Sequence, residues 1–230
     1  MTLALAAALS LLSNLAVAEG PAEEEAPTEE AAEQPPEAPV EVEEVLPIPS
    51  TAYSVSDADS LLYVVLVAPE DSKAHSHVVK AADVQGSVTW GETGREISVS
   101  FPVSSLAPDM DDMRAMVGFE DKVKPKHQAK VKQHLLADNQ LDGENFDTVR
   151  FTSSSITETD AGWLVKGQME IHGQSADVET LLNVTEANGV FSGTTSFEIK
   201  GSDFGFEPYS KGPFTNSDTL VVHVKLAAAE

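Results

Sequence analysis

Histidine is the residue type in this sequence with the clearest capacity for chemistry. Two of the six histidines, His75 and His77, flank Ser76, and alternate residues of an extended segment point to the same side. Both imidazoles can therefore reach one metal ion, which would need a further ligand such as His172, His223 or a distant carboxylate. The spacing favours solvated or hydrogen-bonded histidines and leaves a metal site at His75 and His77 as the alternative.

A second pair, His127 and His134, is separated by seven residues in a segment with helical spacing. Residues seven apart lie close to one face of a helix. Their neighbours Lys126, Lys130 and Lys132 make that face basic. We interpret it as a solvated basic stripe and not as a metal or catalytic site.

The side chains that support hydrolysis or cation binding lack their usual context. Ser153–Ser155 has no flanking glycines to form the sharp turn that exposes a serine nucleophile. Asp109, Asp111 and Asp112 lack the glycine and distal glutamate of a calcium loop. No phosphate-binding glycine loop is present either. The sequence therefore predicts a protein that is not an enzyme, with no catalytic residues and no cofactor.

Charge is distributed unevenly along the 230 residues, which carry 14 Lys and Arg against 38 Asp and Glu, a net charge of −24. Eleven of the acids lie between Glu19 and Glu44, and no Lys or Arg precedes Lys73. Only the run from Lys122 to Lys132 is basic. Nucleic acid is therefore not expected as a partner, and an anionic membrane surface is disfavoured electrostatically. The chain has no cysteine, so disulfides and thiolate chemistry are excluded.

The N-terminal segment reads as an export signal. An apolar run from Leu3 to Leu12 precedes Ala16-Val17-Ala18, the small-residue pattern of a signal-peptidase site, although the usual Lys or Arg at the start is missing. We expect a signal peptide at 1–18 and a periplasmic or secreted protein. Residues 19–50, rich in proline and glutamate, are expected to form a disordered acidic linker, leaving residues 51–230 as the folded domain.

Residues beyond Tyr53 follow mainly the period of β-strands. Ile97, Val99, Phe101 and Val103 alternate with polar residues, and the same alternation recurs in segments that begin at Trp163, Phe191 and Leu220. One interval differs, because between Pro108 and Asp138 there are few β-branched residues, and Val123, His127, Val131 and Leu135 recur at every fourth position. We predict one or two short helices there, broken near Gly118 and restarting around Pro125. The expected fold is mainly β: an antiparallel, lipocalin-like β-barrel of about eight strands with a short helical insertion.

Several short motifs occur in a characteristic order: His134 before Leu135, Phe151 before Thr152-Ser153, His172-Gly173, and Ser202, Asp203 and Gly205 in Ser-Asp-Phe-Gly. This order resembles the YceI-like family of exported lipid-binding proteins. The resemblance spans roughly Tyr53 to Leu226. The segment from Ala74 to Val79 is similar to the family variant with a histidine-rich strand. The sequence departs from the family at Gly201, where arginine is usual, in the segment Asp121–Lys132, and in Gln174–Val178.

The resemblance implies an antiparallel barrel whose apolar cavity holds a long isoprenoid or fatty amphiphile. We expect an exported protein that sequesters or transports such a ligand. The ligand would be a polyisoprenoid, an isoprenoid quinone or another membrane-derived lipid. Every second residue of each strand would face inward and line the cavity. We predict that the lining includes Tyr63, Phe101, Trp163, Ile171, Phe197, Phe204 and Val222. The motifs at His172-Gly173 and Ser202–Gly205 are expected to shape turns and the barrel mouth. A histidine-dependent metal-binding protein and an interaction or structural protein of the cell envelope remain alternatives. Monomer and homodimer are both left open.

Overall fold

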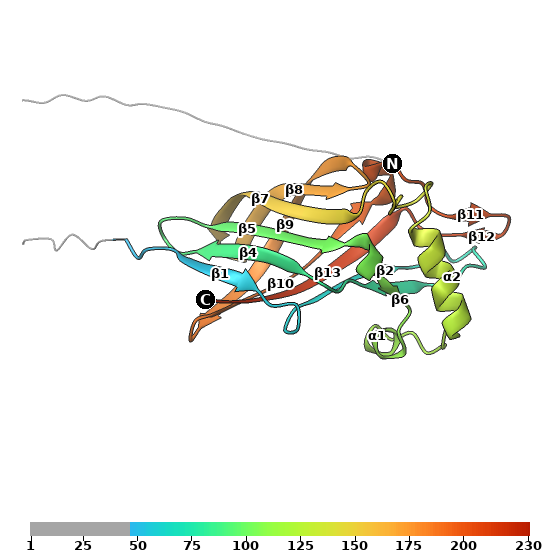
Figure 1. The fold of residues 1–230 in the computed structure, drawn as a ribbon, viewed down its shortest axis with the longest axis horizontal. Helices are drawn as coiled ribbons and strands as arrows, with labels where there is room; N and C mark the ends of the chain where they lie inside the picture. Colours follow the sequence, from blue (N-terminus) through green and yellow to red (C-terminus); the bar gives the residue numbers. More distant parts are fainter. Residues whose placement is uncertain (1–46) are drawn as a thin grey trace, which may run out of the picture. The chain divides into compact units, whose positions relative to one another are not determined.

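The computed structural model describes residues 47–230, so the expected signal peptide and almost all of the expected linker lie outside the described residues. Strand β1 begins at Thr51. The described chain is dominated by one antiparallel sheet in the order β1-β4-β5-β7-β8-β9-β10-β13-β2-β3-β6, and a further pairing joins β1 to β13 (Figure 1). This last pairing, Ser54 with Ala229 and Val55 with Ala228, closes the sheet into a barrel.

Three pairs of short strands each act as one long strand of the barrel. β1 (Thr51–Val55) and β2 (Leu61–Leu66) follow one another along β13 (Thr219–Ala229). β3 (His77–Lys80) and β4 (Gln85–Trp90) run beside them, and β5 (Glu96–Pro102) and β6 (Ala107–Pro108) come next. The three pairs and β13, together with β7 (Thr148–Thr159), β8 (Gly162–Ile171), β9 (Gln174–Ala187) and β10 (Val190–Lys200), make eight strand positions in the barrel. The predicted closed barrel is confirmed.

Polar side chains stabilise the breaks inside these long strands. The hydroxyl of Ser60 accepts a hydrogen bond from the Ala227 amide at 3.0 Å, where β1 gives way to β2. The carboxylate of Asp57 accepts one from the Val84 amide at 2.8 Å, where β3 gives way to β4. Since an unpaired backbone amide is costly to bury, these side chains allow the strands to bend without losing hydrogen bonds.

The serine run at Ser153–Ser155 forms a β-bulge between β7 and β8. Its first hydroxyl accepts a hydrogen bond from the Ile97 amide at 2.9 Å, and its second donates to the Lys166 carbonyl at 3.2 Å. Bulges of this kind bend a strand and increase its twist. The serines therefore have a role in shaping the barrel.

One end of the barrel, here called the closed end, is filled by aromatic side chains. Trp90 packs edge-on against Trp163 with 4.9 Å between ring centroids, and Phe191 lies 5.0 Å from Trp90. Arg95 stacks over Trp163 at 4.3 Å. Phe191 is fully buried. These bulky rings leave no room for a ligand and close the barrel there.

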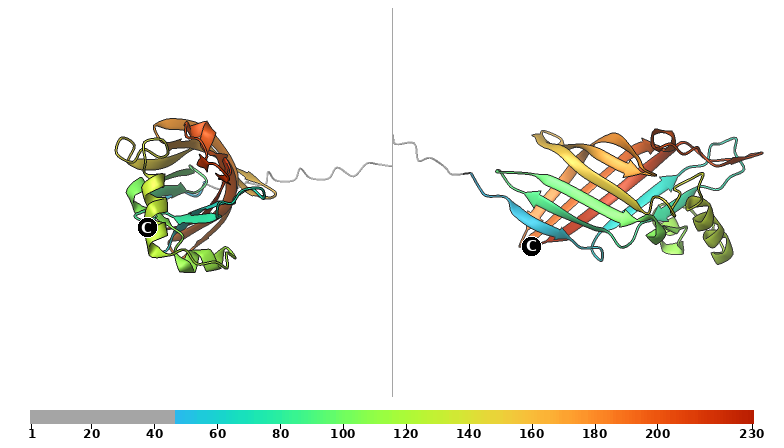
Figure 2. Two further views of the ribbon diagram at one scale, coloured as in Figure 1. Left: turned by 90° about the vertical axis from the view of Figure 1, so that its right-hand side faces the viewer. Right: turned by 45° about the horizontal axis from the view of Figure 1, so that its top comes forward.

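The other end, here called the mouth, carries the helical insertion. α1 (Asp111–Met116) and α2 (Pro125–Leu135) follow β6, and Pro125 at the first turn of α2 and Gly118 at φ 80° between them match the predicted break and restart. Seen end-on, the strands form a ring and α2 crosses one side of its opening (Figure 2). Neither α-helix of residues 47–230 is long and apolar enough to cross a membrane.

Short elements between β10 and β13 complete the mouth. The 3-10 helix η2 (Gly201–Phe204) follows β10, and a small hairpin of β11 (Ser210–Lys211) and β12 (Phe214–Thr215) comes after it. A second 3-10 helix, η1 (Val103–Ser105), joins β5 to β6. The helices and longer loops thus gather at the mouth, while the β7–β8 and β9–β10 turns lie at the closed end (Figure 1).

Candidate ligand-binding cavity

The interior of the barrel is hollow between the closed end and the mouth. The cavity has a volume of about 220 Å³, and nearly all of its lining is aliphatic or aromatic. On β13 alone Leu220, Val222, Val224 and Leu226 face it, which corresponds to roughly 20 Å along the strand. The alternation of inward apolar and outward polar residues creates this surface, because successive side chains of a strand point to opposite faces.

Four of the seven predicted lining residues point into the cavity: Phe101, Ile171, Phe197 and Val222. Tyr63 borders the cavity, but its ring stacks on His223 with 4.6 Å between centroids. Since its neighbours Leu62 and Val64 face the interior, alternation places the Tyr63 ring on the outer face. The apolar run of β2 has no polar alternates, so its sequence does not reveal which residues point inward.

The other two predicted residues lie elsewhere. Trp163 belongs to the aromatic group that fills the closed end. Phe204 is buried in η2, beside the mouth, and is not part of the cavity wall. Trp163 lies near the start of β8 and Phe204 lies in a 3-10 helix, and at neither place does strand alternation decide whether a side chain reaches the cavity or the surrounding core.

Two hydroxyls interrupt the apolar lining. Thr180 on β9 and Thr195 on β10 both face the cavity, and their hydroxyl oxygens are 2.5 Å apart. Backbone pairing between the two strands extends from Val190 with Ala187 only as far as Thr194 with Asn183. The threonine pair therefore joins β9 and β10 just beyond the point where their ladder ends, and it is the polar feature of the deep cavity.

Residues outside the strands form the wall at the mouth. Leu135 of α2, Leu141 and Gln140 of the following loop, and Phe206 after η2 all line the cavity. Helical spacing marked Leu135 as one of the apolar residues of α2. Sequence reasoning missed the contribution of all four to the cavity, because loop residues follow no period and the direction of a helix relative to a barrel is a tertiary property.

A second, more open hollow leads from the cavity to the surface at the mouth. This hollow, here called the vestibule, has a volume of about 530 Å³ and shares Leu66, Val79, Leu135, Gln140, Phe206 and Leu220 with the cavity. The cavity alone is smaller than the roughly 300–1,000 Å³ of typical ligand sites, while the vestibule lies within that range. Polar and titratable side chains surround it: His75, His77, Asp121, Lys122, His127, Lys130, His134, Glu207, Tyr209, Asn216, Ser217 and Asp218.

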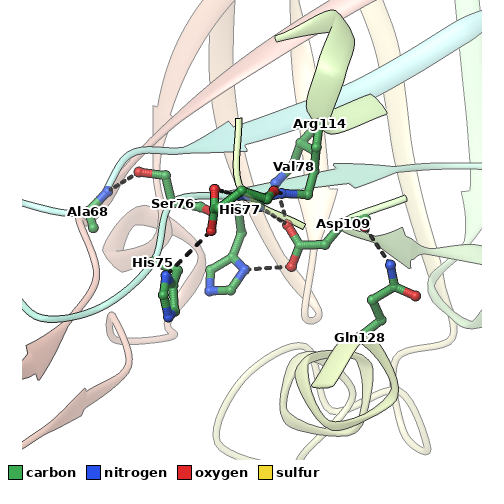
Figure 3. A network of polar contacts seen from close by, with 9 residues as sticks. Ala68, His75, Ser76, His77, Val78, Asp109, Arg114 and Gln128 are labelled. Atoms are coloured by element: carbon green, nitrogen blue, oxygen red, sulfur yellow. Dashed lines mark hydrogen bonds and ion pairs between the residues drawn. The ribbon is translucent and has the colours of Figure 1, made fainter. Parts of the chain in front are cut away.

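A buried carboxylate supports the floor of this vestibule (Figure 3). Asp109, fully buried, accepts hydrogen bonds from Arg114 at 2.8 Å and from the Val78 amide at 3.2 Å. Its second oxygen lies 2.7 Å from Nδ1 of His77. Gln128 of α2 donates to its backbone carbonyl at 2.6 Å. One residue thus connects β3, α1 and α2.

The charge of Asp109 is stabilised within this network. Burial by itself raises the pKa of a carboxyl group, but the hydrogen bond and charge of His77 and the hydrogen bond from Arg114 outweigh it. The pKa of Asp109 is therefore held below its ordinary value. Arg114, also buried, forms a further ion pair with Asp121 and so links the network to the vestibule.

The two histidines considered for a metal site engage different carboxylates. His77 bonds Asp109, while Nδ1 of the exposed His75 lies 3.7 Å from Asp121 (Figure 3). The further ligands considered contact other residues, since His172 packs against Phe146 in the turn after β8 and His223 stacks on Tyr63. Within residues 47–230 no three His, Asp or Glu side chains are arranged to hold a metal ion.

The motif residues His172 and Gly173 form the turn between β8 and β9. Both have positive φ, 54° and 68°, as a two-residue hairpin turn requires. The His172 ring packs edge-on against Phe146 at 5.1 Å, and its Nδ1 lies 3.3 Å from the Phe204 carbonyl oxygen. A side chain at Gly173 would collide with Phe146. The pair therefore forms a tight turn that packs against Phe146 at the mouth.

The motif from Ser202 to Gly205 anchors η2 at the mouth. The amide and hydroxyl of Ser202 donate to the carboxylate of Asp218 at 2.9 and 2.6 Å. The Ser202 hydroxyl is the main cause that lowers the pKa of Asp218. Gly205 ends η2 at φ 81°, and Asp203 is exposed in its first turn. These residues shape the rim of the vestibule.

The remaining two motif residues meet the cavity and the vestibule. Phe151 of β7 lines the cavity, and its ring fits because Gly167 on β8 has no side chain: a Cβ there would lie 2.6 Å from Cζ of Phe151. His134 of α2 lines the vestibule and packs edge-on against Tyr209 at 5.6 Å. The resemblance thus rests on residues that form the barrel interior and its rim.

Replacing Gly201 with alanine is expected to lower the free energy of unfolding by about 1–3 kcal/mol. A Cβ at this position would lie 2.6 Å from Cε2 of Phe206, the ring that lines both cavity and vestibule. Urea unfolding measures the loss. A Phe206→Leu background provides the control, because removing the ring should make the same alanine substitution less costly. Equal costs in both backgrounds would contradict the steric explanation.

The fold and site together define a closed antiparallel β-barrel with an apolar cavity that opens through a polar vestibule at one end. A family model described as the YceI-like domain matches residues 67–228, and the chain belongs to this family. The fold resembles BcnA of Burkholderia cenocepacia, with 15% identity, a TM-score of 0.58, and coverage of 76% of this chain and 99% of that chain.

A second similar structure is the YceI protein of Campylobacter jejuni. It is 16% identical, with a TM-score of 0.50, and the match covers 66% of this chain and 84% of that chain. At these identities the two structures show a shared fold. A search of curated proteins found no match.

Proposed function

We propose that this protein is an exported carrier that sequesters or transports a long hydrophobic ligand, a polyisoprenoid, an isoprenoid quinone or a fatty amphiphile. The observation that carries the proposal is the cavity itself, which is apolar, hollow, closed at one end and continuous with a vestibule at the other. Burial contributes about 0.8 kcal/mol for each methylene group. A flexible chain can therefore bind here with few polar contacts.

The architecture favours binding over catalysis. The cavity lining offers two threonine hydroxyls and Gln140 as its polar groups, and the first two are bonded to one another. The buried ion pair of Asp109 and Arg114 and the hydrogen bond from Gln128 connect structural elements. Membership of the YceI-like family supports the same interpretation. Export is supported by the sequence pattern at 1–18, which lies outside the described residues.

One preparation tests both parts of the proposal. The protein is purified from the exported fraction of its own cells without added detergent, extracted with organic solvent, and the extract is analysed by mass spectrometry. We expect about one hydrophobic chain per protein molecule and an N-terminus at Glu19. Recovery of no stoichiometric lipid, combined with no binding of added lipid, would overturn the carrier function. An intact leader on the purified protein would overturn the export assignment.

A further inference from the structure

The vestibule has one cationic wall, provided by α2. His127, Lys130 and His134 all face the vestibule, and their spacing of three and four residues places them on one side of the helix. Residues 122–136 contain five lysines and no acid, in a chain with a net charge of −24. Two of these lysines, Lys122 and Lys130, line the vestibule at the opening of the apolar cavity.

The acids that face the same space are mostly engaged by other donors. Asp121 forms an ion pair with Arg114, and Asp218 accepts two hydrogen bonds from Ser202. Glu207 contributes one exposed carboxylate to the vestibule lining. Lys122, also at the vestibule, forms an ion pair with Asp111, with 3.2 Å between Nζ and Oδ2. Lys130 and the two histidines of α2 thus remain as exposed groups that can meet a ligand.

The same helix also contributes to the cavity. Leu135, the neighbour of His134, lines both cavity and vestibule. An apolar chain that fills the cavity must therefore leave it beside α2, with its polar end next to Lys130 and His134. Lysine ammonium and imidazole N–H groups make their strongest hydrogen bonds to anionic oxygens. The exposed position of these groups also makes such contacts sensitive to salt.

We propose that the α2 wall binds the head group of the ligand and that this head group carries anionic oxygens, as in a phosphate or a carboxylate. The inference rests on the proposed carrier function and specifies its ligand class: a single long apolar chain with an anionic head. Lys130 supplies the charge, and His127 and His134 supply further N–H donors. Their basic stripe, which the sequence indicated as merely solvated, becomes a recognition surface through its position at the mouth.

The test compares three probes with the same chain: dodecyl phosphate, dodecanol and dodecyltrimethylammonium. Each is titrated calorimetrically, below its micelle concentration, into delipidated full-length mature protein. We expect dodecyl phosphate to bind at least about tenfold more tightly than dodecanol, and dodecyltrimethylammonium to bind most weakly. The preference for dodecyl phosphate should shrink as salt concentration rises.

Variants then locate the preference. The double variant Lys130→Gln/His134→Gln should bind dodecyl phosphate and dodecanol within about threefold of each other, with the dodecanol affinity unchanged. The matched control is Lys126→Gln, because Lys126 is exposed on α2 but lies outside the vestibule lining. It should retain the full preference. Thermal unfolding of all three proteins verifies that the helix stays folded.

The outcomes separate the two proposals. Equal binding of the three probes by the unsubstituted protein, or a preference that survives in the double variant, would overturn the head-group inference and leave the carrier function standing. Failure of all three probes to bind would overturn the carrier function. Loss of the preference in Lys126→Gln as well would show a general effect of helix charge and would overturn the assignment to the vestibule wall.

Discussion

The variant Val178→Trp is expected to bind dodecanol and dodecyl phosphate roughly 100-fold more weakly than the unsubstituted protein, a loss of about 2.8 kcal/mol. Val178 lies on β9 with its side chain in the cavity and only 7% exposed. An indole at this position would occupy much of an interior of about 220 Å³. Because the cavity is hollow, the ring can enter it with less strain than in a packed core, where overpacking costs about 1–3 kcal/mol.

The adjacent residue provides a matched control for this substitution. Asp177 is exposed on the same strand, and alternation directs it away from the cavity. Asp177→Trp should therefore leave both affinities unchanged. Isothermal titration gives the affinities, and urea unfolding verifies that both variants are folded. A folded Val178→Trp protein that binds as tightly as the unsubstituted one would show that the ligand does not occupy the barrel.

Substitution of Asp109 by asparagine is expected to lower the free energy of unfolding by about 3 kcal/mol at neutral pH. The change removes the charge that Arg114 and His77 contact at 2.8 and 2.7 Å, and Arg114 is 2% exposed. Asparagine tolerates the positive φ of 55° found at this position, so backbone strain adds little. Urea unfolding monitored by tryptophan fluorescence measures the difference.

The dependence of this loss on pH provides a second measurement. The pKa of Asp109 is lowered in the folded protein, so its contribution is complete above the unfolded value of about 3.9 and disappears as pH falls through the lower folded value. The difference in stability between the unsubstituted protein and Asp109→Asn should therefore be constant near neutrality and shrink below about pH 4. A difference that stays constant down to pH 2 would contradict the electrostatic explanation.

A surface ion pair supplies the control. Asp111 contacts Lys122 at 3.2 Å, but both side chains are more than half exposed. Exposed pairs contribute at most about 1 kcal/mol, so Asp111→Asn should change stability little. An equal loss in both variants would show that burial of the Asp109 network is not what makes it stabilising.

The strand pattern predicted much of the cavity because alternation is a local property of the chain. Ile171 and Val222 point inward, since each belongs to a strand in which polar residues occupy alternate positions and face outward. Tyr63 shows where this reasoning ends: every position of β2 is apolar, and the direction of its ring is decided by the pairing with β13. Trp163 lies near the start of β8 and Phe204 lies in η2, where neighbouring loops and turns determine what a side chain contacts.

The network around Asp109 had no recognisable signal in the sequence. Asp109 and His77 are 32 residues apart, and Arg114 lies on a different element from both. Only the folding of α1 and α2 against β3 brings their side chains together. The role of Asp109 in joining elements depends on its burial, which the spacing of residues along the chain does not indicate.

By itself the sequence determined the fold class, the position of the helical insertion and the family. Strand alternation, turn residues and motif order can all be recognised from residues that are close together in the sequence. The tertiary structure decided what those elements enclose. Whether a barrel is filled or hollow depends on how closely side chains from opposite walls pack. The basic face of α2 can contact a ligand only because the helix lies across the mouth. Contacts between residues far apart in the sequence therefore determine the binding site, while local sequence patterns determine the barrel that holds it.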